Sequence, residues 1–90
     1  MSRTGKLLAR VLSGHAEANI RFNELCHLLD RLGFIMHVRG SHHIFTKAGL
    51  VRPINLQRTS GAAKEYQVQQ VRDILIEYGL TSIDRGRDDD

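Results

Sequence analysis

The stretch that decides the fold, LGFIMHVRGSHHIFTKAGLVRPINLQ, spans residues 32–57. From Phe34 onward its apolar residues change from helical spacing to alternation, which is typical of a strand with one covered face. Gly40-Ser41 predicts a turn, after which residues 42–46 and 50–57 are expected to form two more strands. Pro53 lacks a backbone N–H, so we expect the third strand to lie at an edge or to be bulged.

Helical patterns flank this stretch on both sides. Residues 6–13, 22–32 and 65–78 repeat apolar side chains at three- and four-residue intervals. We expect Asn23 to cap the second helix, Gly33 to end it, and Leu80 to pack back on Leu75 after the third. The sequence therefore predicts an α+β domain with helices on one face of a three-stranded antiparallel sheet.

The chain length limits this to one domain. Ninety residues supply a single core, which we place in residues 6–80. Residues 1–5 are expected to be disordered, as is the acidic segment 81–90. After an extra short N-terminal helix, the order of helices and strands resembles that of the double-stranded-RNA-binding domain, which reads RNA by shape and backbone contacts.

Composition excludes several classes of protein. No apolar run approaches the roughly 18 residues that a membrane span needs, and residues 1–13 lack the apolar core of a signal peptide. A single cysteine, Cys26, excludes an internal disulfide framework, so a cytoplasmic location is expected. Cys26 and the histidines could be imagined as a zinc site, but a cysteine without a CxxC partner favours a small apolar role in the core.

The charge is unevenly distributed. Thirteen Lys and Arg against ten Asp and Glu give a net charge of +3, yet residues 38–64 contain no acid. This run predicts a surface for phosphates, with a merely solvated face as the alternative. Its five cations, the expected RNA-binding residues, are Arg39, Lys47, Arg52, Arg58 and Lys64.

The end of this run is a loop. Arg58, Ser60, Gly61 and Lys64 could hold a phosphate through two cations and backbone amides; the alternative is a mobile loop. Tyr66 and Phe45 could stack on bases, although a place in the core is the more usual role of such residues.

Two of the five histidines, His42 and His43, follow the Gly40-Ser41 turn directly. An imidazole titrates near neutral pH and can act as a general acid or base, whereas a structural or exposed role is the alternative. Alternation separates the two side chains, since His42 shares a face with Ile44 and His43 shares the other with Phe45. If Phe45 packs on the helices, His42 points to the open face of the sheet.

These residues carry a family resemblance. Leu32-Gly33-Phe34, the segment Arg39-Gly40-Ser41-His42-His43-Ile44-Phe45 and the closing Gly79-Leu80 resemble the signature of the HicA family of mRNA interferase toxins. The resemblance covers residues 22–80. It implies a double-stranded-RNA-binding-like fold, metal-independent cleavage of mRNA by His42 without a cofactor, and an acidic HicB-like antitoxin as partner. Ser41, His43 and Arg39 are the expected supporting residues, and the free protein is expected to be a monomer or weak dimer.

The sequence also departs from the family pattern. Gln57 stands near the position where many members have a histidine in or after the third strand. A general acid is then either missing or supplied by His43 or His37. The alternatives that stay open are a non-catalytic RNA-binding module with the same basic face, and a protein-interaction domain with an acidic partner.

Overall fold

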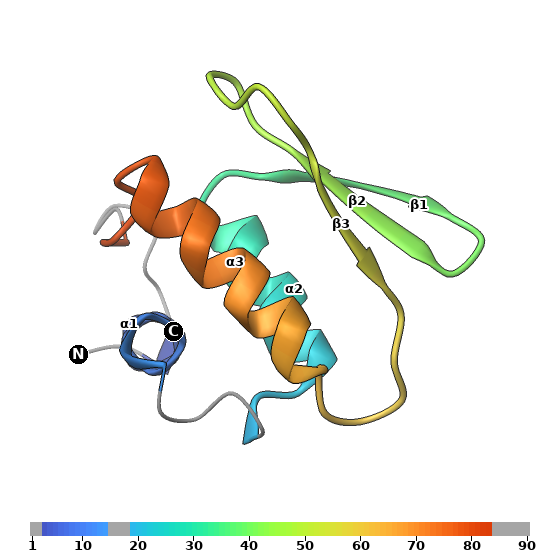
Figure 1. The fold of residues 1–90 in the computed structure, drawn as a ribbon, viewed down its shortest axis with the longest axis horizontal. Helices are drawn as coiled ribbons and strands as arrows, with labels where there is room; N and C mark the ends of the chain where they lie inside the picture. Colours follow the sequence, from blue (N-terminus) through green and yellow to red (C-terminus); the bar gives the residue numbers. More distant parts are fainter. Residues whose placement is uncertain (1–2, 15–18, 84–90) are drawn as a thin grey trace.

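A computed structural model describes residues 3–14 and 19–83 and confirms an α+β architecture (Figure 1). No helix in these two ranges is long and apolar enough to cross a bilayer. The elements, in chain order, are α1 (Arg3–Ser13), α2 (Phe22–Arg31), β1 (Ile35–Arg39), β2 (His42–Thr46), β3 (Ile54–Gln57) and α3 (Glu65–Glu77).

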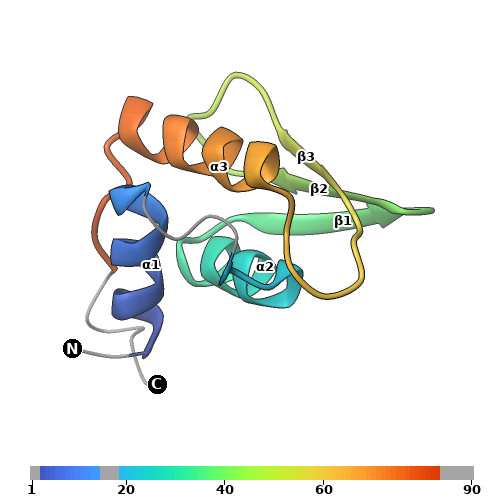
Figure 2. The same cartoon turned by 60° about the horizontal axis from the view of Figure 1, so that its bottom comes forward.

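The three strands form one antiparallel sheet in the order β1-β2-β3. Phe45 on β2 and Ile54 and Leu56 on β3 are fully or almost fully buried, which identifies the face that the helices cover. α2 and α3 lie side by side against this face, and α1 packs on their far side (Figures 1 and 2). The predicted meander with helices on one side is therefore confirmed, and the opposite face of the sheet is open.

Both helices that cover the sheet end as the sequence predicts. At the end of α3, Leu80 N–H donates to Leu75 O and Gly79 N–H to Ile76 O, the two hydrogen bonds of a Schellman motif. α2 ends in the same way after Gly33, whose φ of 96° is in the region that favours glycine. The start of α2 differs from the prediction. Its N-cap is Arg21, whose backbone N–H donates to Glu24 Oε1 at 2.9 Å, and not Asn23.

The N-terminal helix is longer than predicted and belongs to the core. It begins at Arg3, so residues 3–5 are helical where disorder was expected. Leu7, Leu8 and Val11 are buried against α2 and α3, which explains the gain in order. At the other terminus Ile83 packs against the core, beyond the expected boundary at residue 80. The rest of the predicted disordered segments, residues 1–2 and 84–90, lies outside the described residues.

Two strand predictions need correction. β3 begins at Ile54 and not at residue 50, because Pro53 cannot donate to the ladder and the chain turns before it. Alternation in β1 does not produce a buried face, since Met36 and Val38 are 48% and 54% exposed. The β1–β2 hairpin extends past the helices, so the helix side of its outer strand remains uncovered (Figure 1).

Candidate nucleic-acid interface and histidine site

His42 lies on the open face of the sheet, as the burial of Phe45 requires. Its Nδ1 is 3.2 Å from Oδ1 of Asn55, a residue of the neighbouring strand on the same face. With the amide oxygen as acceptor, Nδ1 carries the proton and the Nε2 lone pair stays available. No other hydrogen bond of the His42 ring occurs among the described residues, so this imidazole is held at one nitrogen and open at the other.

The register brings further polar side chains to the same face. Arg39 on β1 and Gln57 on β3 lie directly opposite His42 on either side. His37 pairs with Ile44 and is therefore the diagonal neighbour of His42, at a separation of about 7–8 Å by sheet geometry. Of the two histidines considered as a second catalytic group, His37 thus shares the face of His42.

His43 lies on the other face. Its ring packs edge-to-face on Phe22 of α2, with centroids 5.2 Å apart and an interplanar angle of 87°. Its Nδ1 is buried and has no hydrogen-bond partner within the part of the chain that the structure describes. This side chain packs between sheet and helix and does not reach the solvent around His42.

The five cations of the acid-free run divide between the two ends of the sheet. One end of the sheet carries the Gly40-Ser41 turn and the last residue of β3, and we call it the His42 end. The opposite end of the sheet is the far end. Arg39 pairs with His42, and Arg58 N–H donates to Ser41 O at 2.7 Å, so both residues belong to the His42 end. Lys47 follows β2 at the far end, where a Cβ placed on Gly33 would lie 2.8 Å from its Nζ.

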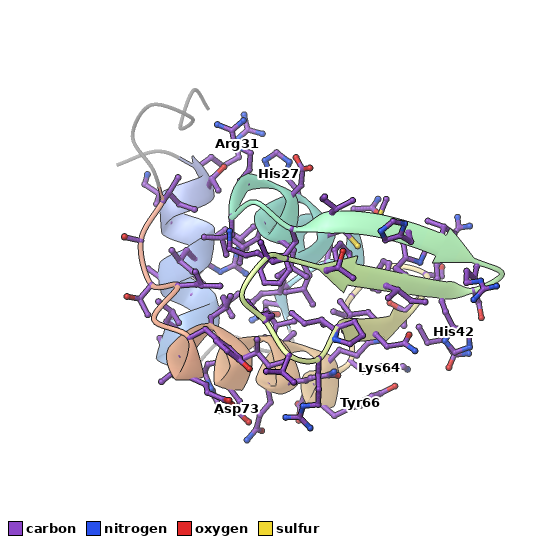
Figure 3. The ribbon with its side chains drawn as sticks, turned by 90° about the horizontal axis from the view of Figure 1, so that it is seen from above. His27, Arg31, His42, Lys64, Tyr66 and Asp73 are labelled. Atoms are coloured by element: carbon purple, nitrogen blue, oxygen red, sulfur yellow. The ribbon has the colours of Figure 1, made fainter. Side chains whose placement is uncertain are left out.

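Hydrogen bonds of Gln67 hold Lys64 near the His42 end. Gln67 is buried, donates from Nε2 to Gln57 O at 2.8 Å and accepts the backbone N–H of Lys64 at 3.0 Å. These bonds tie the start of α3 to the end of β3. Figure 3 shows His42 and Lys64 toward the same end of the sheet, with His27 and Arg31 away from it.

Backbone hydrogen bonds anchor the loop between β3 and α3, for which a mobile loop was the alternative interpretation. Besides the bond from Arg58, Phe22 N–H donates to Gly61 O at 2.9 Å and Ala63 N–H to Ile20 O at 2.7 Å. The loop therefore joins the His42 end of the sheet to the start of α2. Backbone bonds and the bond from Thr59 Oγ1 to Ala62 O set its conformation, and the side chains of Arg58 and Ser60 remain available for contacts.

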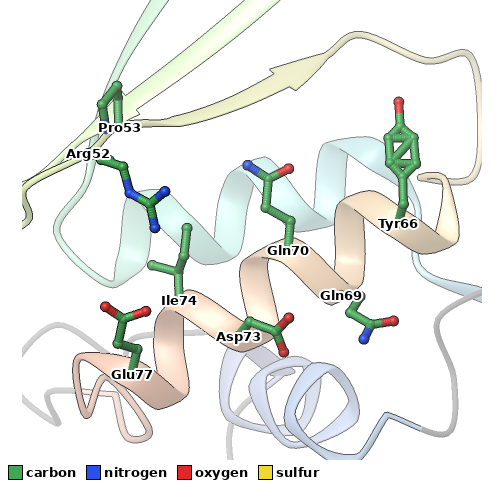
Figure 4. Close-up of a pocket in the computed structure, with 8 residues that line it drawn as sticks. All are labelled: Arg52, Pro53, Tyr66, Gln69, Gln70, Asp73, Ile74 and Glu77. Atoms are coloured by element: carbon green, nitrogen blue, oxygen red, sulfur yellow. The ribbon is translucent and has the colours of Figure 1, made fainter.

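Arg52 lies at the far end, in a groove between α3 and the loop before β3. Figure 4 shows its guanidinium reaching across toward Ile74 and Glu77, with Tyr66 and Gln70 further along α3. Tyr66 is 62% exposed, so its expected place in the core is wrong, whereas Phe45 is a core residue. The groove contains no histidine.

Cys26 behaves as a packing residue. Burial raises the pKa of its thiol from 9.0 to about 11, because a thiolate would be poorly solvated there. Within residues 3–14 and 19–83, no three His, Cys, Asp or Glu side chains gather where they could hold a metal ion.

Sequence reasoning did not single out Asn55, Gln67 or Arg21. Asn55 alternates with the apolar Ile54 and Leu56, a pattern that could have placed it beside His42. Gln67 stands three residues after Lys64, which is the spacing of a capping side chain. Arg21 stands three residues before Glu24, which is the same capping spacing, but no local pattern predicts its contact with the loop after β3.

Comparison with known proteins adds no relative. No family model, no curated protein and no solved structure matches the chain.

Proposed function

We propose that the protein is a HicA-like toxin of a toxin–antitoxin pair, an endoribonuclease in which His42 is the catalytic base. The observation that carries the proposal is the His42–Asn55 pair on the open face, which leaves Nε2 available beside Arg39. The sequence resemblance and the gathering of Arg58 and Lys64 at the same end support it. The order of elements after α1 is that of a double-stranded-RNA-binding-like fold, and we propose that relationship as well.

In the proposed reaction, His42 Nε2 takes the proton from a ribose 2′-OH. The 2′ oxygen attacks the adjacent phosphorus, and the bond from phosphorus to the 5′ oxygen of the next nucleotide breaks. His37, as imidazolium, gives a proton to that leaving oxygen, so the products are a 2′,3′-cyclic phosphate and a 5′-OH. Arg39 stabilises the charge that develops on the phosphate.

Asn55 acts as a positioning residue in this scheme. Its amide oxygen keeps the proton on Nδ1 and so directs the basic nitrogen, Nε2, toward solvent. The acidic HicB-like partner would cover the His42 end, where a carboxylate surface meets Arg39, Arg58 and Lys64.

The direct test is cleavage of a mixed mRNA pool in EDTA by the wild type and by His42→Ala. We expect the variant to lose at least about 100-fold in rate while its RNA affinity changes little, since general-base catalysis supplies a factor of that order. His27→Gln, on α2 and away from the His42 end, is the matched control and should cleave normally. An RNA with a single 2′-deoxy sugar at the cleaved position should resist the wild type.

Asn55 provides a second test, because a positioning role affects the pH profile. Asn55→Ala should lower the rate about tenfold with unchanged RNA affinity. Asn55→Asp should retain activity but move the rising limb of the pH–rate profile to higher pH, since a carboxylate favours the imidazolium form. An unchanged profile in Asn55→Asp would contradict the proposed contact.

The second candidate function is a non-catalytic RNA-binding module. It is favoured by Gln57, which lies opposite His42 where many family members have a histidine. RNA binding without cleavage by the wild type, under all conditions that keep the protein folded, would establish this alternative.

A further inference from the structure

An open pocket of about 450 Å³ lies at the His42 end. By alternation from His42 and Gln57, Ser41 and Arg58 are expected to face the helix side of the sheet. Residues from three separate segments line it, namely Arg21, Asn23, Ser41, Arg58, Thr59, Ser60 and Gly61. The site therefore combines the start of α2, the β1–β2 turn and the loop after β3.

The lining of this pocket carries positive charge and no acidic residue. Arg21 and Arg58 are exposed, and neither forms an ion pair with any residue that the structure describes. No aspartate or glutamate lines the pocket, and the nearby Glu24 accepts the Arg21 backbone N–H. Two arginines without acidic partners suit an anion whose oxygens accept several hydrogen bonds.

Neutral donors complete the set. The hydroxyls of Ser41 and Ser60 form no hydrogen bond within the described ranges. The first turn of α2 adds a small positive potential. A phosphate group accepts bonds from guanidinium and hydroxyl groups alike and offers more acceptor oxygens than a carboxylate, so a lining with four such donor side chains suits this class of ligand.

The pocket is preorganised by the backbone. Arg58 is fixed by its bond to Ser41 O, and Gly61 by its bond from Phe22 N–H. Arg21 holds its place as N-cap through its backbone. None of these bonds uses an arginine side chain, so the guanidinium groups can rearrange around a ligand without loss of the fold.

We propose that this pocket binds a phosphate group, and that in RNA it takes a phosphodiester next to the one that His42 faces. The second half of this statement rests on the proposed function. His42 and the pocket lie on opposite sides of the same sheet end, so the bound strand must bend over the Gly40-Ser41 turn to reach both. A dinucleotide, which has one phosphodiester, then cannot occupy both places.

The first experiment titrates inorganic phosphate into the protein and follows backbone amide shifts by NMR. We expect saturable shifts at residues 58–61 and Ser41, and about tenfold weaker binding in Arg21→Gln and in Arg58→Gln. Arg52→Gln removes the same charge at the far end and is the matched control. Shifts that do not saturate, or equal losses in all three variants, would overturn the phosphate site.

The second experiment separates the pocket from catalysis. Arg21→Gln should raise KM for an RNA oligonucleotide about tenfold with little change in kcat, while leaving cleavage of a dinucleotide unchanged. If phosphate binds as expected but no RNA is cleaved, the pocket stands and the proposed nuclease function fails. If RNA is cleaved and Arg21→Gln has the wild-type KM for both the oligonucleotide and the dinucleotide, the pocket does not bind a flanking phosphodiester.

Discussion

At the His42 end of the sheet, Arg39 and Arg58 are exposed and Arg39 lies opposite an oriented histidine, whereas at the far end Lys47 lies against Gly33 and the Arg52 side chain points toward α3. In the sequence these cations form one acid-free run. An antiparallel meander divides such a run, because successive turns fall at alternate ends of the sheet. A continuous charge pattern in the sequence therefore corresponds to two surfaces in the fold, of which one adjoins a group capable of chemistry.

The largest expected effect comes from removing charge at one end at a time. The double variant Arg39→Gln/Arg58→Gln should weaken RNA binding about 100-fold, since each charge-assisted contact contributes about tenfold. It should also reduce the slope of log K against log salt by about 1.4, or about 0.7 for each phosphate contact. Fluorescence anisotropy across a salt series measures both quantities.

The matched variant at the far end is Lys47→Gln/Arg52→Gln, which removes the same charge. We expect about a twofold loss of affinity, because those cations act on the bound RNA only at long range. Equal losses in the two double variants would show that both ends bind RNA and would remove the distinction between them.

A smaller effect is expected from the side chain that joins α3 to the His42 end. Gln67→Ala should lower the free energy of unfolding by about 2 kcal/mol, since Gln57 O and Lys64 N–H both lose their partner. Urea denaturation measures this loss. Gln69→Ala, on the exposed side of the same helix, should stay within about 0.5 kcal/mol of the wild type.

The smallest effect concerns the far end. Gly33→Ala places a side chain at a φ of 96° and close to Lys47 Nζ, and should cost about 1–2 kcal/mol of stability. Gly49→Ala has a φ of 95° and open space around it, so it carries the backbone strain alone and should cost slightly less. Neither variant should change RNA affinity, and a loss in Gly33→Ala would connect the far end with binding.

Sequence patterns predict most of this fold because its elements are locally encoded. The alternation around Phe45, the turn at Gly40-Ser41 and the glycine that ends α2 each specify structure within a few residues. The same alternation predicts that His42 faces away from the helices. The alternation in β1 wrongly predicts a covered face at Met36 and Val38, because their exposure depends on how far the helix layer extends beneath the hairpin.

The remaining features of the candidate site are set by contacts between distant segments. The orientation of His42 depends on Asn55, thirteen residues later, and the pocket beside it depends on Arg21 meeting the loop after β3. The burial of Gln67 follows from a carbonyl ten residues earlier in another element. No periodicity within one segment contains this information, because each contact depends on how two elements pack.

Because α1 packs against α3, the core can be completed only after α3 has been synthesised. A ribosome completes α1 first and α3 last, so Leu7, Leu8 and Val11 have no α3 to pack on until synthesis is nearly finished. The strand with His42 emerges well before that point, on a chain whose core is still incomplete. The His42 end is complete only after α3 has been translated, because Gln67 of α3 supplies the bond to Gln57 O at the end of β3.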